Sequence, residues 1–246
     1  MLALLAGFID AVVGGGGLIQ VPALLVTLPQ APLPALFGTN KISAMAGTSF
    51  AAYQYAKRIS FDKTLLTIVA ITAAASAYCG AQVVSHIDVH TLKPAILIIL
   101  IFIAIYTYLK KDLGSVQTQQ PEKKNKLIYG TLLGVVIGFY DGFFGPGTGS
   151  FLVLGFVVVL GFEFLHASAY AKIINCTTNL GALIVFIGHG QYYLGLAILM
   201  AICNVIGNII GTQMAFQKGN AFIRKIFLFI VTIMIVRYAY DVFENL

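Results

Sequence analysis

The sequence contains few charged residues, and this scarcity excludes most classes of soluble protein. Only 10% of its 246 residues are Asp, Glu, Lys or Arg, whereas 59% are hydrophobic. Apolar runs recur along the whole chain, several near or above the roughly 18–20 residues that a membrane-spanning helix needs. They leave no length for a soluble catalytic domain, and they are apolar on every side, unlike the strands of a transmembrane barrel. The sequence therefore predicts an all-α, polytopic membrane protein.

Other absences narrow the function. The three cysteines, an odd number, all lie in apolar segments, so they are interpreted as small packing residues and not as a disulfide or metal framework. No Gly-x-x-x-x-Gly-Lys-Ser/Thr motif is present, so direct ATP drive is not expected. The 15 Lys and Arg residues gather in short connections and form no nucleic-acid-binding stripe. We expect no enzyme activity, no cofactor, no metal and no nucleic-acid partner.

The chain contains two copies of one pattern. At an offset of 131 residues the register holds without a gap, and it aligns Asp10 with Asp141 and Lys41 with Lys172. Charged residues that coincide in a single frame indicate an internal duplication and not chance similarity of apolar sequence. The predicted organisation is a first repeat over 1–109 whose first helix looks clipped, a solvated linker over 110–126, and a second repeat over 127–246.

Each repeat divides into about five apolar segments separated by glycine-rich, polar or charged breaks. The predicted fold is a helical bundle of two inverted-topology repeats, with eight to ten segments when the short glycine-linked helices are counted. The segments cover approximately 1–13, 17–28, 38–56, 61–84 and 94–109 in the first repeat, and 127–144, 149–162, 169–188, 192–216 and 222–240 in the second. The sequence leaves open whether the short first pairs span the membrane or turn back inside it.

The distribution of basic residues predicts the orientation. The connection after the third segment of the first repeat contains Lys57, Arg58 and Lys63, whereas the equivalent connection at 189–191 contains no Lys or Arg. Because basic connections favour the cytoplasm, the repeats are predicted to be inserted in opposite directions. In a bacterial inner membrane, the linker at 110–126 is then expected to be cytoplasmic and both termini periplasmic.

Both repeats carry a glycine-rich break between their first two segments. Non-helical backbone inside a membrane must be buried in protein or line a wet cavity, because lipid cannot satisfy its polar groups. The helix that begins after each break presents free N–H groups and the positive end of its dipole, which suits an anion. The alternative is that the glycines only permit tight helix crossing. The glycines predicted to bind substrate are Gly14, Gly15, Gly16 and Gly17 in the first break, and Gly145, Gly147 and Gly149 in the second.

A lysine lies a few residues inside the third segment of each repeat. Lys41 follows Asn40, and Lys172 shares one helix face with Asn175 and Asn179 at i, i+3 and i+7. Because a charge inside the membrane costs at least about 2.5–3.5 kcal/mol, it usually faces a transport route or a partner. These residues are therefore predicted to bind substrate together with the glycines. The alternative is that both lysines extend to the membrane interface.

Asp10 and Asp141 precede the glycine breaks by four residues, about one helical turn. They are candidates for an ion pair, for a cap on the N–H groups at the break, or for carrying a coupled proton. Because the repeats are predicted to be inverted, each third segment starts on the side where the other repeat has its break. Lys41 is thus predicted to approach 145–149, and Lys172 to approach 14–17.

The fourth segments contain small residues at helical spacing. In the second repeat Gly207 and Gly211 accompany Asn204 and Asn208, one turn apart. Helix packing explains the small residues, whereas the asparagines are candidates for a polar lining. The comparable small residues of the first repeat are Ala73, Ala77 and Gly80.

The motifs at 7–22, 39–41, 138–150 and 171–181 resemble those of the TauE/SafE sulfite exporter family, also called TSUP, and most closely its YfcA-like branch. The resemblance covers essentially the whole chain. It implies a multi-pass transporter of the bacterial inner membrane, usually described with seven or eight spans, whose relatives move sulfite, sulfoacetate or other sulfur-containing anions. The predicted ten segments and the short first helix depart from that pattern.

These features favour a secondary membrane transporter, an exporter or permease, for a small anion that is sulfur-containing or an organic acid. The glycine breaks and the two lysines form its predicted site, and ion or proton coupling is assigned to Asp10 or Asp141. Its expected partners are the anion, the lipid bilayer and a second copy of the chain in a homo-oligomer. The alternatives are an ion channel or a membrane scaffold subunit and, less favoured, an intramembrane enzyme that acts on a lipid.

Overall fold

The structure, a computed structural model, describes residues 1–28, 30–84 and 121–244. Within these residues the chain forms eight helices and no strand, so the all-α prediction is confirmed. The helices are α1 (Leu2–Val13), α2 (Gly17–Thr27), α3 (Leu33–Ala56), α4 (Lys63–Val84), α6 (Lys123–Phe143), α7 (Thr148–Leu160), α8 (Phe164–Gly188) and α9 (Leu194–Glu244).

Four of these helices are long and apolar enough to cross a membrane: α4, α6, α8 and the part of α9 over Leu194–Phe229. The helices next to the glycine breaks are shorter, with 12 residues in α1, 11 in α2 and 13 in α7. At 1.5 Å per residue they measure about 17–20 Å, against a hydrocarbon core of about 30 Å. The described helices therefore include both full-length and short membrane segments.

Several predicted bounds differ from the observed ones. The third segments begin earlier than predicted, at Leu33 and Phe164. In α3 the reason is a proline in the first turn, a position where its missing N–H breaks no helical hydrogen bond. The segment predicted over 127–144 also begins earlier, because α6 starts at Lys123 with a charged first turn. The predicted segment 94–109 and most of the linker lie outside the described residues.

The last two predicted segments, 192–216 and 222–240, both lie within α9, which consists of two helices joined at a kink. Gly219 interrupts it with φ 64° and ψ −161°, a backbone conformation outside the helical region. The predicted break between the segments is therefore present, but it consists of one glycine and not of a connecting loop.

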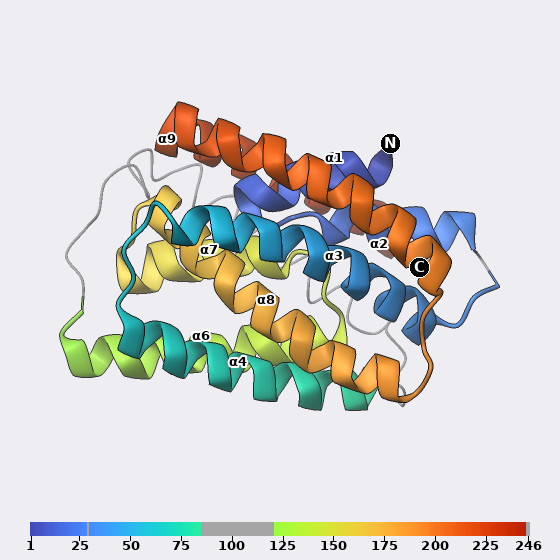
Figure 1. The fold of residues 1–246 in the computed structure, drawn as a ribbon, viewed down its shortest axis with the longest axis horizontal. Coiled ribbons are helices and arrows are strands. Elements are labelled where there is room, and N and C mark those ends of the chain that lie inside the picture. The colour runs from blue at the N-terminus through green and yellow to red at the C-terminus, as the bar shows by residue number, and fades with distance from the viewer. Residues whose placement is uncertain (29, 85–120, 245–246) are drawn as a thin grey trace.

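The helices lie side by side along the long axis of the molecule (Figure 1). The pair α4 and α6 forms one edge, and α9 with α1 forms the other. Between these edges, α8 packs on α4 and α3 packs on α9, while α3 and α8 contact each other. Each edge thus combines a helix of the first half with a helix of the second half.

The two edge pairs pack through glycines at equivalent positions. A Cβ atom at Gly80 of α4 would overlap the carbonyl oxygen of Phe139 in α6. A Cβ atom at Gly211 of α9 would likewise overlap the carbonyl oxygen of Phe8 in α1. Close backbone approach at small residues is how membrane helices gain packing energy in the absence of a hydrophobic drive. The helix-packing interpretation of Gly80 and Gly211 is confirmed.

One end of the bundle brings together basic residues from distant parts of the chain. Lys126 Nζ lies 3.7 Å from Asp62 Oδ2, which joins the start of α6 to the α3–α4 connection. The guanidinium of Arg58 lies 4.5 Å from the ring centroid of Phe216, which joins that connection to α9. We call this end the basic end.

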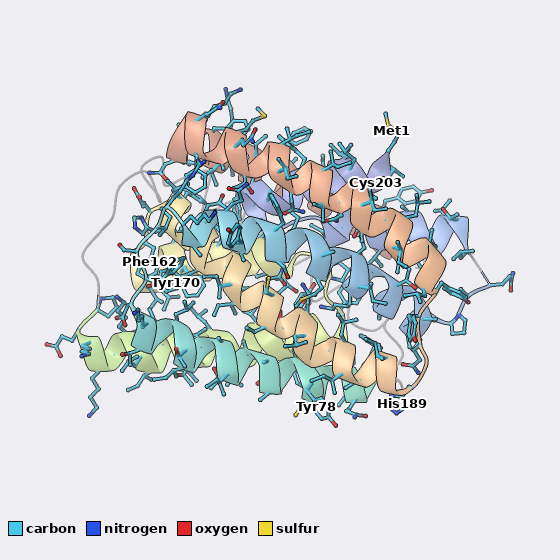
Figure 2. The ribbon with its side chains drawn as sticks, viewed as in Figure 1. Met1, Tyr78, Phe162, Tyr170, His189 and Cys203 are labelled. Atoms are coloured by element: carbon cyan, nitrogen blue, oxygen red, sulfur yellow. The ribbon has the colours of Figure 1, made fainter. Side chains whose placement is uncertain are left out.

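The opposite end carries the α8–α9 connection. The backbone N–H of Tyr193 donates to Thr39 Oγ1 at 2.9 Å, so this connection contacts the first turns of α3. Figure 2 places His189 there, at the far side of the molecule from Phe162. An open pocket of about 550 Å³ lies at this end, lined by Thr27, Leu28, Gln30, Ala31, Tyr193 and Leu196.

Replacing Gly211 by alanine is expected to lower the thermal stability of the purified protein. The added methyl group must displace the α1 backbone, and such overpacking costs about 1–3 kcal/mol. The matched control is Gly195→Ala on the same helix, where a Cβ would meet nothing within 4 Å. Thermal unfolding in detergent checks both variants, and an equal Tm for the two would contradict the packing argument.

Candidate functional site

The two glycine breaks meet in the interior of the protein. Gly14 ends α1 with φ 79° and Gly147 precedes α7 with φ 89°, both in the left-handed region that glycine favours. A Cβ atom at Gly14 would overlap the backbone of Gly149, and a Cβ at Gly149 would overlap Gly14. The breaks of the two halves are thus in direct backbone contact. Gly14 and Gly149 therefore permit a tight crossing of the two main chains.

The other glycines of the first break lie between α1 and neighbouring helices. Gly15 and Gly16 are buried, and a Cβ at Gly16 would lie 2.8 Å from Asp10 Cβ. A Cβ at Gly17 would lie 3.9 Å from the side-chain nitrogen of Asn40 and 3.9 Å from a carbonyl oxygen of the second break. The start of α2, the second break and α3 therefore converge at Asn40.

Lys41 forms an ion pair with the aspartate of the other half. Its Nζ atom lies 2.6 Å from Asp141 Oδ2, and the two residues are only 3% and 2% exposed. The Lys41 ammonium also borders the second break, since a Cβ at Gly145 would lie 3.4 Å from it. The predicted approach of Lys41 to 145–149 is confirmed.

Lys172 makes the reciprocal contact. Its Nζ atom lies 3.2 Å from Asp10 Oδ2 and donates to the Asp10 carbonyl oxygen, and Lys172 is fully buried. Thr48 donates a second hydrogen bond to Asp10 Oδ2 at 2.9 Å. The N–H of Gly14 shares the Asp10 carbonyl at 2.8 Å. Lys172 therefore contacts the residue one turn before the first break.

The alternative that the lysines extend to the membrane interface is wrong. Each lysine lies eight residues after the start of its helix, Leu33 or Phe164, which corresponds to about 12 Å. Each is buried against a carboxylate, because an unpaired ammonium at this depth would lose its hydration without compensation. Together Lys41, Asp141, Lys172 and Asp10 form two neutral pairs that both link the first half to the second.

The three predicted asparagines are buried, and they differ in whether their side chains are hydrogen-bonded. Asn175 accepts hydrogen bonds from Thr178 within α8, through both its carbonyl and its side chain. The side-chain nitrogen of Asn179 and the side-chain oxygen of Asn40 have no hydrogen-bond partner in the described part of the chain. Asn40 and Asn179 thus retain hydrogen-bonding capacity inside the protein.

Two buried polar residues that the sequence analysis did not single out also lie near these ion pairs. Thr48, which binds Asp10, aligns with Asn179 at the 131-residue offset, so the duplication could have revealed it. Gln20 of α2 is 1% exposed and donates to Ser43 at 3.1 Å, while its side-chain oxygen has no partner in the described residues. The sequence signal for Gln20 was its place as a polar residue in the middle of a short apolar helix.

The cysteines are all free. Cys176 lies 3.6 Å from the Ser49 hydroxyl, whereas Cys79 is exposed on α4, so the packing interpretation is wrong for Cys79. Cys203 lies on α9 along one edge of the molecule (Figure 2). Within the described residues, no three His, Cys, Asp or Glu side chains gather as a metal site would require.

Comparison with known proteins agrees with this architecture. The family model described as "Sulfite exporter TauE/SafE" matches residues 1–238. The chain is 36% identical over 240 residues to "Probable membrane transporter protein ORF9" of a Sinorhizobium species, covering 97% of this chain and 90% of the relative. It is 35% identical over 242 residues to "Probable membrane transporter protein YfcA" of Escherichia coli K12, covering 98% and 88%.

A "Probable membrane transporter protein" of Haemophilus influenzae is 34% identical over 236 residues, which covers 96% of this chain and 91% of the relative. No solved structure matches the chain. Both the family model and these relatives extend over nearly all of the sequence, including both glycine breaks and both lysines. The chain is a multi-pass membrane protein that belongs to the TauE/SafE family of membrane transporters.

Proposed function

We propose that the protein is a secondary transporter for a small anion, either sulfur-containing or an organic acid, in a bacterial inner membrane. The observation that carries this proposal is the pair of buried Lys–Asp contacts, each formed between the two halves at a glycine break. Charged groups at membrane depth are rare and mark ion or substrate routes. Broken helices at the interface of two repeats are the usual setting of such sites.

The anion site consists of Lys41, Asn40 and the second break. Lys41 supplies a positive charge beside Gly145, and the N–H groups at the start of α7 add the positive end of a helix dipole. Asn40 contributes a side chain with unused hydrogen-bonding capacity. The open pocket at the non-basic end is lined in part by Tyr193, whose backbone N–H donates to Thr39, the neighbour of Asn40, so we place the approach to this site at that end.

The charge balance of the interior predicts which ion moves together with the anion. Two lysines and two aspartates sum to zero, so one bound anion leaves a net negative charge in a poorly hydrated region. Burying an uncompensated charge is costly, and protonation of Asp10 or Asp141 removes it. The transported unit is therefore one anion together with one proton, which carries no net charge across the membrane.

The orientation follows from the two ends of the bundle. The α3–α4 connection lies at the basic end, whereas its equivalent, the α8–α9 connection, lies at the opposite end (Figure 1). This arrangement supports repeats that are inserted in opposite directions. The positive-inside rule assigns the basic end to the cytoplasm.

Lys41→Met is expected to destabilise the protein by about 3–5 kcal/mol, because it leaves Asp141 buried without its partner. The double variant Lys41→Met with Asp141→Asn removes both charges and is expected to recover most of the Tm. Neither variant is expected to move sulfite or acetate into proteoliposomes. Exposed Lys124→Met at the start of α6 is the matched control with normal transport.

A double variant that is stable and transports normally would exclude Lys41 as the anion ligand. If the wild-type protein moves sulfite or acetate without a linked proton flux, a channel describes it better. A screen of Tm shifts with sulfite, thiosulfate, sulfonates and carboxylates identifies which anion is used in these assays.

Topology reporters inserted at 57–62 and at 189–191 are expected to report opposite sides of the membrane, with 57–62 in the cytoplasm. The physical reason is the concentration of basic residues at the first connection and their absence from the second. Alkaline phosphatase and green fluorescent protein fusions measure this directly. The same side for both sites would contradict inverted repeats.

A further inference from the structure

A stripe of buried polar residues runs along one face of α9. Asn204, Asn208 and Thr212 follow one another at four-residue spacing and are 1%, 0% and 1% exposed. The stripe extends over about 12 Å of helix. The equivalent face of α4, at the 131-residue offset, consists of Ala73, Ala77 and Ala81, all completely buried. One edge of the bundle therefore has a polar interface where the other has an apolar one.

Glycines of the neighbouring helices make room for the stripe. A Cβ atom at Gly7 of α1 would overlap the backbone of Asn204. A Cβ atom at Gly47 of α3 would overlap the side chains of both Asn204 and Asn208. At the 131-residue offset Gly47 corresponds to Thr178, so the second half does not leave the same space. The asparagine side chains thus lie at the junction of α1, α3 and α9.

The stripe is incompletely hydrogen-bonded within the protein. Asn208 donates to the Asn204 carbonyl at 3.0 Å and to the Asn204 side-chain oxygen at 2.7 Å. The side-chain oxygen of Asn208 and the hydroxyl of Thr212 have no partner in the described part of the chain. Each buried polar group left unpaired costs about 1–3 kcal/mol, a cost that a bound water removes.

The stripe borders the Asp10 ion pair and not the Asp141 pair. Gly47 precedes Thr48, whose hydroxyl donates to Asp10. On the other side, Gly211 lies next to Thr212 and a Cβ there would be 2.8 Å from Ala11 Cβ, adjacent to Asp10. Since Gly7 lies beside Asn204 and Ala11 beside Gly211, Asp10 lies level with the Thr212 end of the stripe.

Other titratable groups also face this part of α1. Lys172 and Cys176 come from α8, and Tyr55 comes from α3 and donates to the Ala11 carbonyl. No titratable side chain of α2, α7 or α9 is recorded in contact with Asp10 among the described residues. Lys172 is therefore the one formal charge of opposite sign that pairs with it there.

We propose that Asn204, Asn208 and Thr212 hold buried water molecules beside the Asp10 ion pair. Buried donors and acceptors that lack a protein partner bind water, whereas apolar interfaces such as Ala73, Ala77 and Ala81 stay dry. This water makes Asp10, and not Asp141, the carboxylate that exchanges protons during transport. This role in coupling rests on the proposed function, whereas the hydration of the stripe does not.

Cysteine labelling tests the hydration separately from transport. In a background with the three native cysteines replaced by serine, Asn208→Cys and Thr212→Cys are compared with the matched variants Ala77→Cys and Ala81→Cys. The probe is silver ion or aminoethyl methanethiosulfonate on the folded protein, followed by mass spectrometry. Labelling at 208 and 212 is expected to be about tenfold or more faster than at 77 and 81.

Equally slow labelling at all four positions would overturn the proposal, because both interfaces would then be dry. Equally fast labelling would also overturn it, since the two edges would not differ. A monodisperse elution profile and a cooperative melt confirm that each variant is folded before it is scored. A failure of the wild-type protein to transport any anion would leave this result unaffected.

The coupling role is tested with Asn208→Ala plus Thr212→Ala, which reproduces the alanines of the other edge. The anion-induced Tm shift is expected to persist, while the proton flux that accompanies anion entry into proteoliposomes falls about tenfold. Thr232→Ala, which removes an exposed hydroxyl bonded within α9, is the matched control. Normal proton flux in the double variant would exclude the stripe as the proton route.

Discussion

The neutralisation of two buried lysines is the constraint on which the rest of the arrangement depends. A membrane interior offers no water to an ammonium group, so Lys41 and Lys172 each need a carboxylate within contact distance. Within the described residues, each finds it in the other half, at 2.6 Å and 3.2 Å. The edge helices, the glycine contacts and the converging breaks are all compatible with holding these two pairs in place.

Much of this arrangement could be predicted from sequence, because the signals were local. Apolar runs located the helices, and the alignment of Asp10 with Asp141 and Lys41 with Lys172 identified the charged residues that matter. The combination of duplication and inversion even predicted that Lys41 would contact the opposite break. Hydropathy could not reveal that the break between the last two segments is the single residue Gly219, because composition does not show how sharply a chain bends.

The sequence did not predict which side chains of different helices contact each other. Thr48 and Gln20 carried weak signals in the sequence, and their roles became clear only from the residues that α1 and α3 place opposite them. A glycine-rich motif also does not show which of its residues permit close packing and which border a charged group. Gly14 provides close packing, while Gly145 borders an ammonium group, so residues of the same type in equivalent motifs have different surroundings.

The backbone contact between Gly14 and Gly149 has a consequence for sequence change. No side chain separates the two main chains, so neither position can accept even a methyl group unless the other moves. The two glycines belong to different halves and do not align with each other at the repeat offset. As the two halves of a duplicated gene diverge, a substitution at either glycine therefore requires a compensating change at the other.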